Sequence, residues 1–261
     1  MSAPEIKLEY LPPVARIILN RPKARNAVSP GMITEIKEAL SEIRGRKNLA
    51  GVVLTGAGAA FSAGLDLREV KASSEGGAGD SFEDSERFMQ LLLDIYSFPK
   101  PVLAAVNGTA LGGGCGLATV CDIVIASEQA SFGYPEVRIG FIPALVSVFL
   151  TRIIGEKRAR EMMLTGRTIS ASEGEMFGLV NRVVADSELI ATAEMMVHSI
   201  ARNSPDAVAL TKEHLLETDG LGLQEALRLA AAKNALSRYY PDFREGISAF
   251  LEKRKPDFKQ E

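Results

Sequence analysis

Three segments of the sequence combine residues whose types and spacing could do chemistry. They are residues 61–67 (FSAGLDL), 107–116 (NGTALGGGCG) and 131–137 (SFGYPEV). The first follows a predicted strand, and the second stands where a strand pattern changes into a helix pattern. Together they offer flexible backbone N–H donors and one carboxylate. These are groups that can stabilise an anion and move a proton.

Gly112 to Gly114 stand at the start of a predicted helix. Glycine frees the backbone for close approach to a ligand, and the first N–H groups of a helix are unpaired at its positive end. Such a site suits a phosphate or a developing oxyanion. The segment matches neither GxxxxGK[ST] nor GxGxxG. From the glycines alone, a tight turn with close helix packing remains an equal alternative.

Glu136 follows Gly133-Tyr134-Pro135 and precedes the apolar run 139–145. A carboxylate among apolar residues is desolvated, which raises its pKa and suits it to proton transfer. A surface glutamate on a loop is the alternative that this residue alone would favour.

Strand and helix signals alternate over the first two hundred residues. Strands are predicted for residues 5–10, 14–19, 50–54, 102–106 and 123–126, with a helix starting at Ser29-Pro30. Apolar runs separated by helix-length segments are typical of a mostly parallel α/β architecture. The fold class expected from the pattern is therefore α/β.

Residues 72–81 (ASSEGGAGDS) predict a mobile surface loop, followed by a helix capped by Ser81 with Asp84. Its apolar residues are expected in the core: Phe82, Phe88, Met89, Leu92 and Tyr96. Beyond about residue 185 the strand signals stop and three helices are expected, one starting at Ser204-Pro205, one over about residues 223–238 and one with Phe243 and Phe250 on its apolar face. A helical tail cannot bury its apolar faces alone, so it is expected to pack on the body or on a neighbouring subunit.

Composition excludes several classes of protein. The 261 residues carry a net charge of −3 and are 46% hydrophobic, which argues against a disordered chain and against nucleic-acid binding. No apolar stretch is long enough to predict a membrane span, and the N-terminus predicts no signal peptide. Cys115 and Cys121 fit neither a disulfide framework nor a zinc site, so two free thiols in a reducing cytoplasm are expected. His198 and His214 fall outside the three segments and are interpreted as structural.

The three segments together resemble the enoyl-CoA hydratase/isomerase (crotonase) family. The resemblance runs from about Ile6 to Phe258 and includes Asn20-Arg21-Pro22, Asn26-Ala27 and residues 250–255 (FLEKRK). It implies a crotonase-like spiral of ββα units over residues 1–200 that binds acyl-CoA. It also implies a helical oligomerisation region over residues 201–261, forming a homotrimer or a dimer of trimers. The substrate would be an acyl-CoA thioester, with no cofactor beyond coenzyme A itself.

The same resemblance assigns roles to individual residues. The backbone N–H groups of Leu65 and Gly113 would form an oxyanion hole for a thioester enolate, and Glu136 would be the catalytic carboxylate. The resemblance implies the following substrate-binding residues, with Lys253 reaching a neighbouring subunit: Ala63, Gly64, Asp66, Leu67, Arg68, Gly112, Lys23, Arg25 and Lys253.

The sequence departs from the family at one catalytic position. The family's hydratases hold water with two glutamates, and the first of these positions is occupied here by Gly116, twenty residues before Glu136. Glu69, Asp84 and Tyr134 are candidate helpers. The segment 142–147 (IPALVS) resembles hydratases of branched or unusual acyl groups, such as the methylglutaconyl type.

The favoured hypothesis is a hydratase of a 2-enoyl-CoA double bond with Glu136 as general acid and base. A double-bond isomerase, which needs only one carboxylate, is the alternative, and a glutaconyl-type decarboxylase is a third. From another class, the chain could be a non-catalytic protein that binds CoA esters or RNA.

Overall fold

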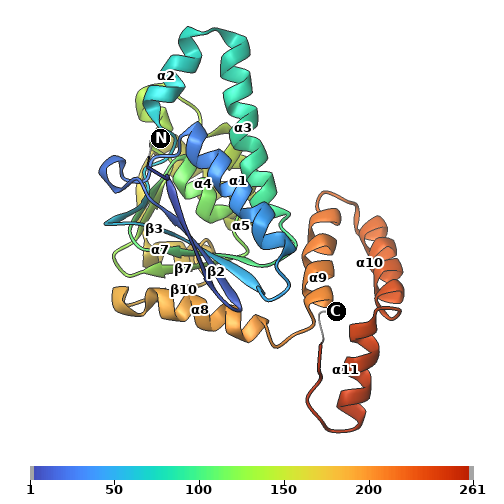
Figure 1. Ribbon diagram of the computed structural model, residues 1–261. Coiled ribbons are helices and arrows are strands. Elements are labelled where there is room, and N and C mark those ends of the chain that lie inside the picture. Colours follow the sequence, from blue (N-terminus) through green and yellow to red (C-terminus); the bar gives the residue numbers. More distant parts are fainter. Residues whose placement is uncertain (1–2, 259–261) are drawn as a thin grey trace.

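The computed structural model describes residues 3–258, whose centre is a six-stranded sheet (Figure 1). The strand order is β1-β2-β3-β5-β7-β10. β1 pairs antiparallel with β2, and every other neighbouring pair is parallel. The strands are β1 (Ile6–Leu11), β2 (Val14–Leu19), β3 (Gly51–Gly56), β5 (Val102–Val106), β7 (Ile123–Ser127) and β10 (Arg182–Val184). The predicted α/β class and all five predicted strands are confirmed.

A second, four-stranded sheet has the order β4-β6-β8-β9. Its strands are β4 (Ala60–Ser62), β6 (Thr109–Leu111), β8 (Ser131–Gly133) and β9 (Thr168–Ser170). β4, β6 and β8 are mutually parallel, and each follows a long strand of the first sheet along the chain. The chain therefore repeats a unit of long strand, short strand and helical segment, which is the spiral of ββα units that the resemblance implied.

Helices cover both faces of the large sheet, which explains its nearly continuous apolar strands. In β3, Val52 and Leu54 face the main core, whereas Val53 faces a smaller cluster against α8. The helical elements of this body are η1 (Pro22–Ala24), α1 (Pro30–Gly45), α2 (Leu67–Glu75), α3 (Ala78–Tyr96), α4 (Gly113–Thr119), η2 (Pro135–Ile139), α5 (Ala144–Ile154), α6 (Glu156–Thr165), α7 (Ala171–Phe177), η3 (Asp186–Glu188) and α8 (Leu189–Ile200). As predicted, α1 begins after Ser29, whose side chain accepts a hydrogen bond from the Met32 N–H at 3.1 Å.

The expected loop over residues 72–81 is wrong. Only Gly76 and Gly77 separate α2 from α3, and Gly77 makes the turn with a φ of +106°. The expected capping box is wrong as well, because Ser81 lies inside α3 and its hydroxyl donates to the Ser73 carbonyl at 3.3 Å. The small, polar residues of 72–81 correctly predicted that this segment is exposed to solvent. They could not show that two helices pack against each other there as a hairpin.

The predicted apolar stripe of this helix is only partly buried. Phe88 and Leu92 lie in the core, whereas Phe82 is 64% exposed and Met89 is 36% exposed. Phe82 lies near the start of α3, close to the hairpin turn at Gly76 and Gly77.

Three helices form the C-terminal tail: α9 (Pro205–Glu217), α10 (Leu223–Ser237) and α11 (Pro241–Leu251). The prediction of three helices beyond residue 185 omitted α8, which belongs to the body. The predicted start of α9 is confirmed, because the Ser204 side chain accepts a hydrogen bond from the Ala207 N–H at 3.0 Å. The tail stands to one side of the sheets (Figure 1), and the Lys212–Asp122 ion pair at 2.6 Å ties α9 to the body. No helix within residues 3–258 combines the length and apolarity needed to cross a membrane.

Candidate active site

Three loops meet at one edge of the small sheet. β4, β6 and β8 run parallel and adjacent, so their carboxyl ends lie side by side. Leu65 follows β4, Gly113 follows β6 and Glu136 follows β8. Ligands in parallel sheets commonly bind beyond the carboxyl ends of the strands. The topology therefore brings together the three residues that the sequence assigned to catalysis.

The Leu65 N–H is left free by the way its loop is held. Val28 forms a parallel bridge with Leu65, in which the Val28 N–H donates to the Gly64 carbonyl at 2.8 Å and the Asp66 N–H donates to the Val28 carbonyl at 2.9 Å. Such a bridge uses the groups on either side of the bridged residue. The N–H of Leu65 therefore points away from Val28.

Gly113 is the first residue of α4, where a helix has no internal partner for its N–H. A Cβ built on Gly113 would lie 3.3 Å from Leu65 Cγ, so the two residues are in close contact. Among residues 3–258 neither N–H group has a hydrogen-bond acceptor, so both are candidate donors to an oxyanion.

The glycines 112–114 fit both interpretations from the sequence, a ligand site and a tight turn with close helix packing. Gly112 has a φ of +50°, and a Cβ there would lie 3.0 Å from Glu136 Oε1. A Cβ on Gly114 would lie 2.5 Å from the Ser62 carbonyl oxygen. Gly114 thus permits close helix packing, while Gly112 keeps space for the carboxylate.

Glu136 lies on η2 with its carboxyl group turned into the molecule. Its Oε2 atom is buried and accepts no hydrogen bond from any residue between 3 and 258. Burial raises the pKa of the carboxyl group above its ordinary value, although a hydrogen bond from the residue's own N–H opposes part of that effect. An unpartnered carboxylate with a raised pKa is suited to accepting and returning a proton.

Two cavities adjoin at the three candidate catalytic residues. Leu65, Gly113 and Glu136 line both a cavity of about 270 Å³ and a larger one of about 750 Å³. The smaller cavity continues along the loops after β4 and β6. The larger one extends between the α2–α3 hairpin and the segment 139–146. A ligand that filled both would have its central atoms beside the donor pair and the carboxylate.

The predicted substrate-binding residues divide into two groups. Ala63, Gly64, Leu67 and Gly112 line the smaller cavity. The remaining predicted residues line neither cavity; they are Asp66, Arg68, Lys23, Arg25 and Lys253. Lys253 follows α11, which lies far from the α2–α3 hairpin within this chain (Figure 1). Their contacts with coenzyme A therefore stay predictions.

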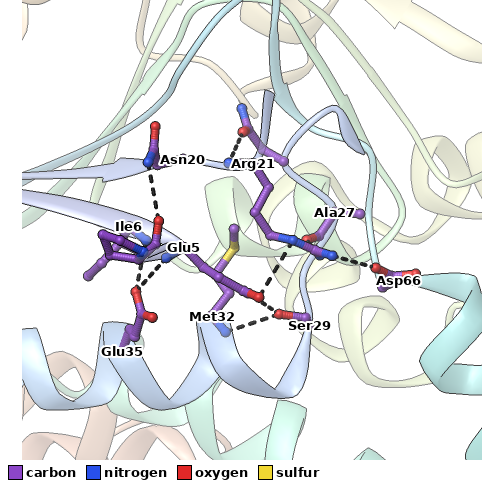
Figure 2. A network of polar contacts seen from close by, with 11 residues as sticks. Glu5, Ile6, Asn20, Arg21, Ala27, Ser29, Met32, Glu35 and Asp66 are labelled. Atoms are coloured by element: carbon purple, nitrogen blue, oxygen red, sulfur yellow. Dashed lines mark hydrogen bonds and ion pairs between the residues drawn. The ribbon is translucent and has the colours of Figure 1, made fainter. Parts of the chain in front are cut away.

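Asp66 has a structural role that the sequence did not reveal. Its carboxylate accepts from Arg21 Nη2 at 2.9 Å (Figure 2). At the start of α2 it also accepts from the Arg68 N–H at 3.2 Å. Burial opposes ionisation of Asp66, but these hydrogen bonds outweigh it and hold the pKa of the carboxyl group below its ordinary range. Asp66 follows Leu65 directly, so the ion pair fixes the loop that carries one oxyanion donor.

Arg21 links this loop to the N-terminal part of the fold (Figure 2). Its Nη1 donates to the Ala27 carbonyl at 2.6 Å, and its Nε lies 3.7 Å from Glu5 Oε1. Ser29 also contacts Glu5, which connects the network to the start of α1. The Asn20-Arg21-Pro22 motif was the only sequence signal for this network, and it gave no indication of the partners.

Asn26 holds the same loop in place through buried hydrogen bonds. It is fully buried, and its Nδ2 donates to the carbonyls of Ala57 and Ala60 at 2.9 and 2.8 Å. The Ser62 hydroxyl donates to the Asn26 carbonyl at 2.8 Å. A buried amide with these bonds rigidifies the chain on both sides of β4.

The position of the family's first glutamate is closed in this chain. A Cβ built on Gly116 would overlap Val146 Cγ1. Val146 lies on α5 and lines the larger cavity. A larger side chain at residue 116 therefore cannot enter without displacement of Val146.

Of the three candidate helpers, Asp84 alone lines the larger cavity. Tyr134 is fully buried and shares a hydrogen bond of 2.8 Å with Thr119 Oγ1, and Glu69 lies on α2 outside both cavities. His198 and His214 lie on α8 and α9, also outside both cavities.

Both cysteines are free, as expected, and both are buried. Burial raises the pKa of Cys115 to about 12, which keeps this thiol protonated and unreactive. No group of three or more His, Cys, Asp or Glu side chains within the described range could hold a metal ion.

Comparisons with known proteins agree with this geometry. Residues 12–261 match the family model described as enoyl-CoA hydratase/isomerase. A putative enoyl-CoA hydratase of Thermus thermophilus is 45% identical over 94% of this chain and 97% of its own length. A mitochondrial enoyl-CoA hydratase of Pongo abelii is 39% identical over 95% of this chain and 84% of its own.

Solved structures show the same fold. The structure of enoyl-CoA hydratase from Bacillus anthracis superposes with a TM-score of 0.90 at 36% identity, covering 98% of this chain and 100% of that one. The enoyl-CoA hydratase from Mycobacterium smegmatis gives a TM-score of 0.92 at 34% identity, covering 98% and 99% of the two chains. This chain therefore belongs to the enoyl-CoA hydratase/isomerase family.

Proposed function

We propose that the protein hydrates the double bond of a 2-enoyl-CoA thioester, with Glu136 as the single acid and base. One observation carries the proposal: the buried, unpartnered Oε2 of Glu136 lies in the cavity that the backbone donors Leu65 and Gly113 also line. The thioester oxygen would accept hydrogen bonds from these two N–H groups. The relatives named as enoyl-CoA hydratases support the same reaction.

The chemistry needs one proton carrier. Glu136 accepts a proton from water as the water oxygen bonds to C3, and the π electrons move through C2 to the thioester oxygen. The resulting enolate is held by the two N–H groups, an arrangement in which one donor contributes about 3–4 kcal/mol. Glu136 then returns the proton to C2, and the carbonyl re-forms. Atoms and charge balance without a cofactor.

Several finer points belong to this proposal. Coenzyme A is part of the substrate, and the acyl group is branched or otherwise unusual. Two buried thiols favour a reducing compartment such as the cytoplasm. The tail over residues 201–261 assembles three chains or six.

A second candidate is a double-bond isomerase. The overlap between Val146 and any side chain at residue 116 favours it, because the space for a second carboxylate is filled. One carboxylate suffices to move a proton between C4 and C2 of the same enolate system.

An acyl-CoA panel in D₂O, followed by mass spectrometry, separates these reactions. The panel contains crotonyl-CoA, a 3-enoyl-CoA and methylglutaconyl-CoA. Hydration predicts a mass gain of one D₂O on a 2-enoyl thioester. Migration of the double bond or deuterium exchange without added water would replace hydration by the isomerase alternative.

A further inference from the structure

The two ends of the larger cavity differ in chemistry. Near Glu136 the wall is apolar, formed by Leu65, Phe88 and Val146. The α2–α3 hairpin contributes Phe88 to this apolar part, and nearer its turn at Gly76–Gly77 it forms a wall whose polar residues are Lys71, Ser73, Ser74, Ser81, Asp84 and Ser85. An acyl chain that starts beside Glu136 and follows this cavity therefore ends against a polar wall.

The serines of this wall present acceptors rather than donors. All four hydroxyls donate to backbone carbonyls of the hairpin, at distances of 2.7 to 3.3 Å. The bonds are Ser73 to Val70, Ser74 to Lys71, Ser81 to Ser73, and Ser85 to Ser81. A hydroxyl whose proton is engaged still has lone pairs for a ligand. Donating to a ligand would require it to break the backbone bond.

The one acidic side chain of the wall adds to this bias. Asp84 is 21% exposed, and its nearest cation is Arg87, with Nη1 3.6 Å away. An ionised carboxylate only accepts hydrogen bonds. Lys71 lies at the rim, where its side chain is 77% exposed and pairs with Glu75 at 3.6 Å. Of the two charged residues that this wall contributes, Asp84 is therefore the more buried.

We propose that this wall recognises an acyl group whose far end carries a hydrogen-bond donor, a hydroxyl or an ammonium, and disfavours one that ends in a carboxylate. The inference rests on the proposed function, since it takes the larger cavity as the acyl site. It makes Asp84 the residue that sets acyl specificity. It also argues against a dicarboxylic acyl group such as that of methylglutaconyl-CoA.

The test uses four 2-enoyl-CoA thioesters of equal chain length that end in methyl, hydroxyl, ammonium or carboxylate. We expect kcat/KM for the hydroxyl and ammonium forms to exceed that of the methyl form by roughly tenfold. The carboxylate form should fall below the methyl form by a similar factor. A carboxylate form that equals or exceeds the methyl form would overturn the proposal, as would a methyl form that is best of the four.

Asp84→Asn should reduce the ammonium-to-methyl ratio of kcat/KM by roughly tenfold and raise the carboxylate form relative to methyl. Glu83→Gln is the matched control, because it removes the same charge from the neighbouring exposed residue of α3 and should leave all ratios unchanged. An Asp84→Asn variant that lowers all four substrates equally would overturn the proposal, since Asp84 would then serve the reaction or the fold.

Calorimetry of the binding of the four saturated thioesters separates the proposed recognition of the acyl group from the proposed reaction. If no thioester is hydrated but the dissociation constants follow the expected order, the proposed reaction fails and the recognition stands. If hydration proceeds but the order is absent, the recognition fails alone.

Discussion

The body of the chain (up to Ile200) and its tail (α9 to α11) both contain helices with apolar side chains at helical spacing. These side chains are buried in the body and exposed in the tail. In the body, α1 places Ile33, Ile36 and Ile43 in the core. In the tail, Leu223 is 78% exposed and Phe250 is 80% exposed. Ala249 is the only buried hydrophobic residue beyond position 200 in the described part of the chain. Apolar periodicity thus predicts a helix in both regions, but it does not say what the helix packs against.

The difference has a functional meaning. Every residue that lines the two cavities of the candidate site belongs to the body, which has its own core. The tail leaves a large apolar surface uncovered, and we expect this surface to contact other copies of the chain. We therefore expect body substitutions to change catalysis and stability, and tail substitutions to change assembly.

The largest effect on stability is expected from Arg21→Met in the body. It leaves Asp66, which is 15% exposed, without its ion-pair partner. The expected loss in free energy of unfolding is roughly 2–3 kcal/mol, measured by urea denaturation. Lys47→Met, at an exposed position, is the control. Adding Asp66→Asn should recover part of the loss, and strict additivity of the two changes would contradict the proposed pairing.

A smaller loss is expected from Gly116→Ala. The new methyl group overlaps Val146 Cγ1, and overpacking of this kind costs about 1–3 kcal/mol. Gly116→Ala combined with Val146→Ala should be more stable than the sum of the single changes predicts. A double-mutant cycle by thermal denaturation measures this coupling. Zero coupling energy would mean that Val146 does not close the position of the missing glutamate.

Glu136→Gln is expected to raise stability slightly at pH 7. Burial raises the pKa of Glu136 above its ordinary 4.5, so the folded state binds the proton more tightly than the unfolded state. The wild type therefore loses stability as pH rises from 4.5 through the folded-state pKa. The difference between the two proteins should vanish below pH 4.5. Unfolding curves across this range provide the measurement, and a pH-independent difference would contradict the assignment.

The smallest effect on the folding of the single chain is expected in the tail. Phe250→Ser removes a side chain that is 80% exposed, so the free energy of unfolding of the dilute chain should change by less than about 0.5 kcal/mol. Sedimentation, in contrast, should shift from a trimer or hexamer toward smaller species. A wild type that sediments as a monomer would refute the predicted assembly.

The sequence predicted those parts of the fold that depend on local pattern. The apolar run 102–106 became β5 with the same bounds, and Ser29 caps α1 as expected. Leu65, Gly113 and Glu136 meet as the resemblance implied, because their segments follow three adjacent parallel strands.

Features that depend on distant contacts could not be predicted. Val146 lies thirty residues from Gly116, and nothing in either segment indicates that they touch. The Gly- and Ser-rich hairpin tip resembled a loop, because its helices are held by contacts such as Ser81 to Ser73 rather than by strong local propensity. Arg21 belonged to a matching motif, but its partner Asp66 is brought close only by the fold.

Glu136 is the sole proton carrier in the proposed reaction. The most direct test is the kcat of Glu136→Gln on a hydrated 2-enoyl-CoA, with thioester binding measured in parallel. We predict a loss in kcat of about 10²–10⁴-fold with binding retained, because the N–H donors of Leu65 and Gly113 are unchanged. A Glu136→Gln enzyme with undiminished turnover would contradict the account.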